Sequence, residues 1–238
     1  MPVIKIPAAQ ISAAEGRKTP GARLRQDSLR INEIFFSLQG ETSRTGLPTV
    51  FVRLTGCPLR CGYCDTAYAF HEGLTRPIDD VLAEVAKYAT RYVCVTGGEP
   101  LAQKPCVILL KRLVDAGYSV SLETSGAIDI SKVDARISRI VDIKTPGSGE
   151  VDKNRWENIA LLRSHDEVKF VLCNEEDYRW SVLVLRKYRL DQKCPVLFSP
   201  VFGDLSPTAL AEWILRDQLP VRMQIQLHKV LWTDARGK

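Results

Sequence analysis

Residues 50–64, VFVRLTGCPLRCGYC, join an apolar run to a loop that holds three cysteines. The run from Val50 to Leu54 is short and rich in β-branched residues, which is typical of a parallel strand covered on both faces. Two glycines and a proline in the loop supply turns that can fold the backbone around a compact object. The stretch therefore predicts a buried strand whose carboxyl end opens into a loop carrying Cys57, Cys61 and Cys64.

Similar units recur along the chain from Ile31 onward. Short β-rich runs alternate with segments of helical periodicity, and this alternation predicts an α/β fold of βα units around a parallel sheet. Strands are expected at residues 50–54, 92–95, 119–122, 140–143, 168–172, 195–198 and 223–227. Helices are expected at residues 77–89, 104–116, 155–163, 175–187 and 207–218.

Polar clusters follow six of the seven predicted strands. In barrels of parallel strands the active site lies at the carboxyl ends of the strands and is assembled from several loops. We therefore expect these clusters to share one site. They are residues 55–57, 96–100, 123–126, 144–146, 199–200 and 228–229.

The 238 residues, 45% of them hydrophobic, are enough for one well-packed domain. Residues 1–29 show little periodicity and predict an irregular N-terminal leader before a single domain at residues 30–238; a transit peptide is the weaker alternative. No stretch approaches the ~20 uncharged apolar residues of a membrane span, and no secretory signal is evident. We expect a cytoplasmic protein that does not enter the membrane.

The formal net charge is +5, and the basic residues are interleaved with acidic ones rather than gathered into a block. This pattern gives no reason to expect direct nucleic-acid binding. A solvated surface of mixed charge explains the excess best, and a small anionic substrate would also suit it.

Four further cysteines stand singly in apolar segments: Cys94, Cys106, Cys173 and Cys194. An odd total in a chain expected in the cytoplasm argues against a disulfide framework. Isolated thiols in such segments usually behave as small buried hydrophobic groups. We therefore expect these four to be structural and the three clustered cysteines to carry chemistry.

Three thiolates at such short separations can hold a metal centre. Iron-sulfur clusters are ligated by cysteine thiolates, and three ligands to a four-iron cluster leave one iron open for an outside ligand. A tetrahedral zinc site completed by His71 is the main alternative. That site would leave the polar clusters at the other strand ends unexplained, so the pattern favours the iron-sulfur cluster.

The segment Thr96-Gly97-Gly98-Glu99-Pro100 follows a predicted strand directly. Its two glycines let the backbone approach a ligand and offer it N–H and C=O groups. Glu99 can accept a hydrogen bond from a ligand amine. Alone the segment predicts only a turn, but together with the cysteine motif it is specific.

The cysteine motif and the Gly-Gly-Glu-Pro loop together resemble the radical S-adenosylmethionine superfamily. Within it the chain is similar to the 7-carboxy-7-deazaguanine synthase family, through residues 38–41 (LQGE), 52–54 (VRL), 64–66 (CDT), 123–126 (ETSG) and 226–229 (QLHK). The resemblance implies a partial (β/α) barrel in which a cluster and S-adenosylmethionine generate a 5'-deoxyadenosyl radical. It also implies conversion of 6-carboxy-5,6,7,8-tetrahydropterin to 7-carboxy-7-deazaguanine with loss of ammonia, towards queuosine.

The same resemblance implies a magnesium ion, an electron donor such as flavodoxin and a homodimer. It makes Cys57, Cys61 and Cys64 the cluster ligands and Thr66 the ligand of magnesium, a hard cation that prefers oxygen. The residues it places around S-adenosylmethionine are Tyr63, Cys64, Asp65, Gly98, Glu99, Asp142, Ile143, Lys144, Ser199, Pro200, Val201 and Phe202. Those it places around the substrate are Leu38, Gln39, Gly40, Glu41, Arg53, Thr96, Glu123 and His228. The fork of the Arg53 guanidinium suits the substrate carboxylate, because it can bind both oxygens.

The chain departs from the usual pattern of this family at several positions. Thr42 stands where the family often has glycine, residues 142–144 (DIK) replace a common Ser-Pro-Lys, and Ser199 replaces a common glutamine. The tail beyond Trp232 also varies in the family. Two other functions stay open: a glycyl-radical activase, which would not need residues 38–41 and 226–229, and a non-catalytic iron-sulfur or zinc protein.

Overall fold

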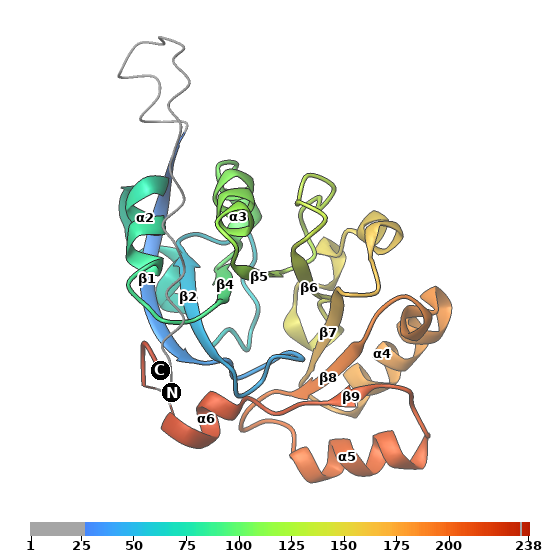
Figure 1. Cartoon of the computed structure of the whole chain (residues 1–238). Coiled ribbons are helices and arrows are strands. Elements are labelled where there is room, and N and C mark those ends of the chain that lie inside the picture. Colours follow the sequence, from blue (N-terminus) through green and yellow to red (C-terminus); the bar gives the residue numbers. More distant parts are fainter. Residues whose placement is uncertain (1–26, 234) are drawn as a thin grey trace, which may run out of the picture.

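The computed structural model describes residues 27–233 and 235–238. In this part of the chain nine strands form one curved sheet in the order β3-β1-β2-β4-β5-β6-β7-β8-β9 (Figure 1). The strands β2 and β4 to β9 run parallel, whereas β1 is antiparallel to β2 and β3 is antiparallel to β1. Their bounds are β1 Ser28–Leu38, β2 Pro48–Leu54, β3 Leu74–Pro77, β4 Tyr92–Gly97, β5 Ser119–Thr124, β6 Ser138–Asp142, β7 Glu167–Leu172, β8 Val196–Pro200 and β9 Arg222–Met223.

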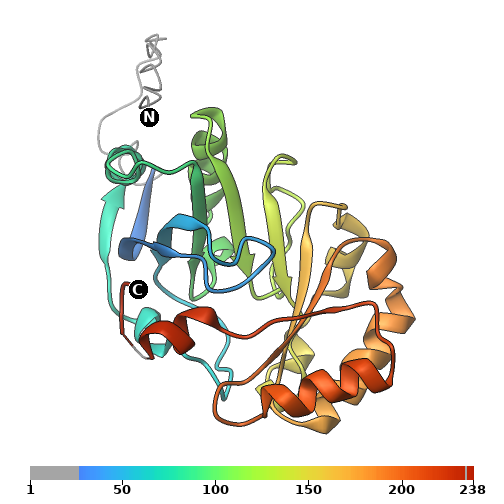
Figure 2. The same cartoon turned by 60° about the horizontal axis from the view of Figure 1, so that its bottom comes forward.

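The α-helices cover the outer face of this partial barrel, except for the last of them. Figure 1 shows α2, α3 and α4 outside the curve of the sheet and α6 across its open side, and Figure 2 gives the same arrangement from below. None of the described helices is long and apolar enough to cross a membrane. Their bounds are α2 Ile78–Val85, α3 Cys106–Asp115, α4 Glu175–Tyr188, α5 Pro207–Arg216 and α6 Leu227–Trp232.

Strand residues alternate between an outer hydrophobic core and the barrel interior. In β7, Val168, Phe170 and Leu172 are fully buried in the core beneath α4 and α5, whereas Lys169 and Val171 line the interior cavity. A second core lies beneath α2 and α3. This period of two places polar side chains inside the barrel while the apolar face of each strand stays buried.

Six of the seven predicted strands are confirmed, and the strand predicted at residues 223–227 is wrong. Only Arg222–Met223 pairs with β8, and Leu227 already begins α6. The alternating sequence MQIQL is typical of a strand. However, the side chains of Gln224 and Gln226 bond to the loop after β1, at Thr42 and Glu41, so the chain leaves the ladder.

Four of the five predicted helices are confirmed, although α2 is shorter than expected. The helix predicted at residues 155–163 is instead a 3₁₀ helix, Trp156–Leu161. The buried side chain of Asn158 donates hydrogen bonds to the carbonyls of Gly126 and Ile128. Asparagine side chains that bond to nearby backbone compete with α-helix formation.

The strands β1 and β3 are not among the predicted strands. Apolar residues of β1 fall on both of its faces, as in Ile34-Phe35-Phe36, so the run does not alternate. Because β1 starts at Ser28, the last two residues of the predicted leader belong to the sheet. Residues 1–26 lie outside the described residues, and a leader there stays a prediction.

The loop between β1 and β2, residues 39–47, closes the amino end of the barrel. The Ser43 N–H donates to both carboxylate oxygens of Glu167 at 3.2 and 3.1 Å, and its hydroxyl bonds to the same group. The Arg44 guanidinium donates to the Ser119 carbonyl at 3.0 Å. Because Glu167 and Ser119 are the first residues of β7 and β5, the loop is fixed to the start of both strands.

Thr42 occupies a backbone conformation that normally favours glycine. Its φ is +72°, in the left-handed region, which explains why the family often has glycine here. Thr42 is buried. Its backbone N–H donates to Gln224 Oε1 at 2.8 Å, and its hydroxyl accepts from the Arg44 backbone N–H at 3.2 Å. These hydrogen bonds hold the backbone of Thr42 in its strained conformation.

A fully buried ion pair joins the starts of β6 and β7. The Arg139 guanidinium donates to both oxygens of Asp166, at 2.5 and 3.1 Å, and to the Leu161 carbonyl at 2.6 Å. The side chains are only 2% and 0% exposed. Neither charged group can reach water, so each depends on the other to offset the cost of its burial.

We expect Arg139→Met to lower the free energy of unfolding by about 3–5 kcal/mol, because it leaves the Asp166 carboxylate buried without a counter-charge. Urea denaturation followed by circular dichroism measures this change. The control is Arg179→Met, which removes an exposed ion pair with Glu175 and should leave stability nearly unchanged. An Arg139→Met protein as stable as the parent would contradict the assignment.

Candidate active site

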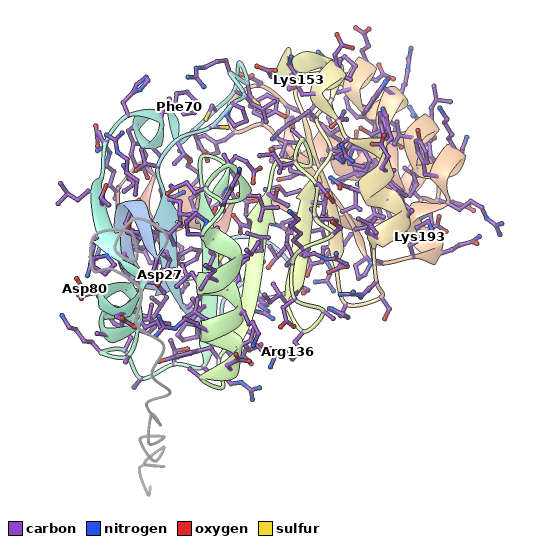
Figure 3. The ribbon with its side chains drawn as sticks, turned by 90° about the horizontal axis from the view of Figure 1, so that it is seen from above. Asp27, Phe70, Asp80, Arg136, Lys153 and Lys193 are labelled. Atoms are coloured by element: carbon purple, nitrogen blue, oxygen red, sulfur yellow. The ribbon has the colours of Figure 1, made fainter. Side chains whose placement is uncertain are left out.

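A cavity of about 440 Å³ opens at the carboxyl ends of the parallel strands. Figure 3 shows Phe70, which lines the cavity, and Lys153 at this end of the barrel, with Arg136 at the other. Most of the predicted site residues line the cavity. They are Leu38, Gln39, Gly40, Glu41, Arg53, Cys57, Cys61, Tyr63, Cys64, Asp65, Thr66, Thr96, Gly98, Glu123, Asp142, Lys144, Ser199, Val201, Phe202 and His228.

The glycine pair at the end of β4 lies directly against the start of the cysteine loop. The Gly98 N–H donates to the Leu54 carbonyl at 3.1 Å, and the Glu99 N–H donates to the Gly56 carbonyl at 2.8 Å. A Cβ on Gly98 would lie 2.4 Å from the Gly56 oxygen and 2.8 Å from Cys57 Cβ. Glycine is therefore needed here because two backbones meet.

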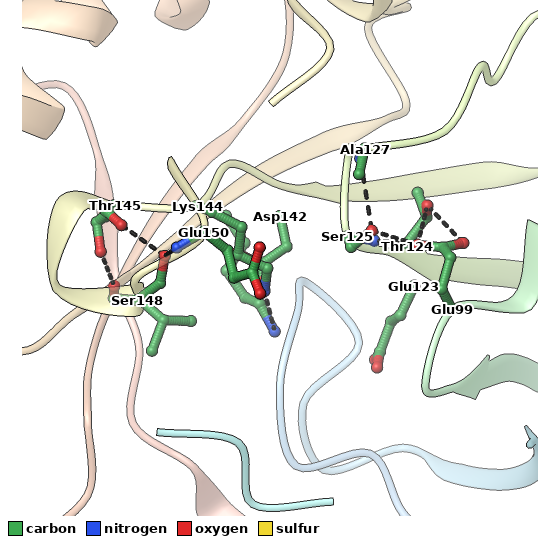
Figure 4. Close-up of polar contacts among 12 residues, drawn as sticks. Glu99, Glu123, Thr124, Ser125, Ala127, Asp142, Lys144, Thr145, Ser148 and Glu150 are labelled. Carbon is green, nitrogen blue, oxygen red and sulfur yellow. Dashed lines mark hydrogen bonds and ion pairs between the residues drawn. The ribbon is translucent and has the colours of Figure 1, made fainter. Parts of the chain in front are cut away.

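Glu99 does not line the cavity. Its carboxylate is fully buried and accepts hydrogen bonds from Leu101 N–H at 2.9 Å, Thr124 Oγ1 at 2.9 Å and Ser125 N–H at 2.7 Å (Figure 4). The side chain thus ties the end of β5 to the end of β4, and an approach to a ligand amine stays a prediction. Ile143 and Pro200 are likewise buried and do not line the cavity, whereas Thr124 and Ser125 do.

The three cysteines of the loop share the cavity with a buried cation. Burial raises the pKa of all three thiols, and the attraction of Lys144 opposes this rise at each of them. Burial would lower the pKa of Lys144, but the Asp142 carboxylate, 2.9 Å from its Nζ, and Cys61 together outweigh burial and raise it. Figure 4 shows the two side chains together. A fixed positive charge here favours thiolate ligands.

The arrangement suits a cluster better than a single zinc ion. Within the described residues no group of three His, Cys, Asp or Glu side chains is placed to hold one metal ion. His71, the predicted fourth zinc ligand, is exposed and does not line the cavity. Cys57, Cys61 and Cys64 line one cavity, and their thiolates would ligate a four-iron cluster there.

The scattered cysteines lie outside the cavity. Cys94, Cys106 and Cys194 are buried, as predicted. Cys173 is half-buried, because it follows the end of β7 rather than lying inside a strand, and its structural role stays a prediction.

Two polar atoms on the cavity wall are buried without a hydrogen-bond partner among the described residues, namely the Tyr63 hydroxyl and Asp142 Oδ1. Both residues are predicted to surround S-adenosylmethionine. Buried polar groups are nearly always hydrogen-bonded, so each of these atoms is suited to bind a ligand or water.

Beside Asp142, on the neighbouring strand β7, Lys169 pairs with Glu41, a contact that the sequence analysis missed. Lys169 Nζ lies 2.8 Å from Glu41 Oε2 and 3.9 Å from Asp142 Oδ2. Burial would raise the pKa of Glu41, but Lys169 and a hydrogen bond from Gln226 outweigh burial and lower the pKa to about 2. The sequence feature that could have indicated this pair is Lys169 itself, a lysine within the otherwise apolar strand predicted at residues 168–172.

Two further predicted substrate residues are linked through Glu123. Its carboxylate accepts from Thr96 Oγ1 at 2.9 Å and from Gln39 Nε2 at 3.4 Å. Arg53 Nε donates to Glu33 at 2.7 Å, and no other side-chain nitrogen of Arg53 has a hydrogen bond to the described residues. The guanidinium therefore keeps Nη donors for an anion.

The prediction that His228 directly follows a strand is wrong, because it lies in the first turn of α6. The helix is held against the loop after β1: the Leu227 N–H donates to the Gly40 carbonyl at 3.0 Å. A Cβ on Gly40 would lie 2.2 Å from His228 Nδ1, so the imidazole packs on a position that only glycine allows. His228 nonetheless lines the cavity, as does Lys238 from the variable tail.

The predicted magnesium ligand lies beside an acidic residue at the cavity edge. Thr66 Oγ1 donates to Asp65 Oδ1 at 2.7 Å, and Asp65 Oδ2 accepts from Gln226 Nε2 at 3.1 Å. These oxygens are of the type that a hard cation prefers.

The chain is similar to known proteins over most of its length. Residues 51–144 match the Radical SAM superfamily. The 7-carboxy-7-deazaguanine synthase of Chlorobaculum tepidum is 46% identical over 213 residues, which cover 88% of this chain and 97% of that protein. The enzyme of the same name from Koribacter versatilis is 43% identical, over 86% of this chain and 97% of its own.

A solved structure shows the same fold. QueE from Escherichia coli superposes with a TM-score of 0.69 at 24% identity, over 88% of this chain and 99% of that one. Because the chain also covers nearly the full length of relatives more than 40% identical to it, it belongs to the 7-carboxy-7-deazaguanine synthase family of the radical SAM superfamily.

Proposed function

We propose that this enzyme converts 6-carboxy-5,6,7,8-tetrahydropterin to 7-carboxy-7-deazaguanine with release of ammonia, a step towards 7-deazapurines such as queuosine. One observation carries the proposal: the three clustered cysteines, nine of the twelve residues predicted to surround S-adenosylmethionine and all those predicted to bind substrate line a single cavity. The product and ammonia together contain the atoms of the substrate. The overall reaction therefore needs no net oxidant.

The chain's part in this chemistry is to hold its ligands next to one another. Cys57, Cys61 and Cys64 would ligate the four-iron cluster, with Lys144 balancing part of the negative charge of the thiolates. When bound, the cluster and S-adenosylmethionine supply the abstraction of a hydrogen atom from the substrate. The unpartnered Tyr63 hydroxyl and Asp142 oxygen would bind S-adenosylmethionine from the β6 side.

The substrate would lie between Arg53 and the acidic residues of the cavity. Arg53 would bind the carboxylate through its Nη groups, because Nε already bonds to Glu33. Glu41 and Glu123 would accept hydrogen bonds from the N–H groups of the pterin. His228, packed on Gly40, would close this side of the cavity.

The same proposal includes a magnesium ion, an electron donor and an oligomeric state. Thr66 would provide one oxygen ligand to magnesium, with substrate and water completing the shell. A donor such as flavodoxin would reduce the cluster, and the enzyme would work as a homodimer; for both, only the family resemblance provides support.

The reaction is tested by anaerobic incubation of the reconstituted protein with S-adenosylmethionine, a reductant, magnesium and the carboxypterin. Mass analysis should show a product lighter than the substrate by one ammonia. Cleavage of S-adenosylmethionine without any change in the carboxypterin would point to another substrate and overturn the proposal.

Changing Cys57, Cys61 or Cys64 to Ala should abolish the visible absorbance of the cluster and all turnover, because each removes one of three thiolate ligands. Iron and sulfide analysis with absorbance spectroscopy measures the loss. Cys173→Ala is the matched control, since its half-buried thiol lies outside the cavity, and it should retain both properties. A Cys61→Ala protein that still assembled an active cluster would refute the ligand assignment.

Arg53→Lys should weaken carboxypterin binding about tenfold to a hundredfold while S-adenosylmethionine binding barely changes, since lysine keeps the charge but loses the two-pronged geometry. Both dissociation constants are measured anaerobically. Arg76→Lys, which alters an arginine paired with Glu84 away from the cavity, should change neither. Selective weakening of S-adenosylmethionine binding would instead indicate that Arg53 contacts the cofactor.

Removal of magnesium should stop turnover of the carboxypterin but leave the cluster absorbance unchanged, because Thr66 lies beyond the last cysteine and would act on substrate binding. Turnover is measured with and without a chelator, and Thr66→Val should need more magnesium for half-maximal rate. Equal turnover in the presence of the chelator would rule out the magnesium site.

A further inference from the structure

Lys169 is a largely buried lysine that lines the cavity and belongs to none of the motifs described above. It projects inward from the middle of β7, and its side chain is 11% exposed. Its Nζ lies 2.8 Å from Glu41 Oε2, and Asp142 Oδ2 lies farther away at 3.9 Å. A lysine is rarely buried unless it is paired, so Glu41 is its principal partner.

The strand β7 holds the loop after β1 at two points. Glu167 and Lys169 are two residues apart and share the inner face of β7, and their partners Ser43 and Glu41 are two residues apart in the loop. The Glu167–Ser43 contact lies at the amino end, outside the cavity that Lys169 and Glu41 line. The loop is therefore anchored below the site by one contact and within the site by the other.

The Glu41 carboxylate retains capacity to bind a ligand. Oε2 accepts from Lys169, and Oε1 accepts from Gln226 Nε2 at 3.0 Å. An ionised carboxylate has about four acceptor positions, so two remain for a ligand. If Lys169 were removed, burial would favour the protonated acid, which has fewer acceptors and a different preferred orientation.

We propose that Lys169 is a positioning residue that holds the Glu41 carboxylate in place for N–H groups of the pterin substrate. This inference rests on the proposed function and adds a residue to its substrate site. The cofactor side has its own cation, because Lys144 lies closer to Asp142, at 2.9 Å. Loss of Lys169 should therefore weaken binding of the substrate and leave binding of S-adenosylmethionine nearly unchanged.

The test measures the dissociation constants of 6-carboxy-5,6,7,8-tetrahydropterin and S-adenosylmethionine on anaerobically reconstituted protein with magnesium and no reductant, so that nothing turns over. Lys169→Met should weaken carboxypterin binding about tenfold to a hundredfold and barely change S-adenosylmethionine binding. Lys169→Arg should recover most of the lost affinity. Glu167→Gln is the matched control on the same strand and loop, and it should have a much smaller effect.

A double-mutant cycle with Glu41→Gln separates positioning from a general structural effect. If Lys169 acts through Glu41, Lys169→Met should cause little further loss of carboxypterin affinity in the Glu41→Gln background. The same loss in both backgrounds, or equal weakening by Glu167→Gln, would overturn the inference. Circular dichroism and iron content verify folding, and Lys169→Gln replaces Lys169→Met in the cycle if the methionine variant does not fold.

This experiment distinguishes failure of the proposed function from failure of the role inferred for Lys169. Absence of carboxypterin binding to the unaltered protein would contradict the proposed function, and the inference with it. Normal binding to both the unaltered protein and Lys169→Met would contradict the role of Lys169 alone.

Discussion

The contact between the glycine pair of β4 and the backbone of the cysteine loop sets the position of everything else in the cavity. The bonds from Gly98 and Glu99 to the carbonyls of Leu54 and Gly56 leave no room for a side chain at Gly98. The Glu99 carboxylate then carries the connection to the end of β5 through Thr124 and Ser125. Three strand ends are thereby locked together, which gives a reactive centre the rigid support that catalysis requires.

Opposite charges inside the cavity are arranged in neighbouring pairs. Glu41 pairs with Lys169, and Asp142 pairs with Lys144. Buried ion pairs contribute little net stability, because desolvation offsets their attraction. Under the proposed function, these pairs would instead keep charged groups in defined places for a ligand that carries both a carboxylate and N–H donors.

The residues predicted to bind substrate come from segments far apart in the chain. The end of β1 and the loop after it contribute residues 38–41, β5 contributes Glu123, and α6 contributes His228. The strained backbone at Thr42 and the close fit of His228 on Gly40 show how tightly these segments are joined. Such constraints concentrate at functional sites, where the surrounding structure maintains them.

Local patterns in the sequence were sufficient for most of the fold and for many of the residues that line the cavity. Six strands, four helices and the cysteine loop were predictable, because apolar periodicity and turn residues act over a few positions. The antiparallel strands β1 and β3 were not, since β1 has apolar residues on both faces. The sequence MQIQL has the alternation of a strand, yet its glutamines bond to a loop about 180 residues earlier in the chain.

Tertiary structure alone decided which charged groups meet. Lys169 and Glu41 are 128 residues apart, and nothing local to either residue indicates the other. Glu99 was predictable as a polar residue at a strand end, but its fully buried bonds to β5 were not. The physical reason is that sequence periodicity reports which face of a strand a side chain occupies, whereas its partner depends on the order of strands and the closure of the barrel.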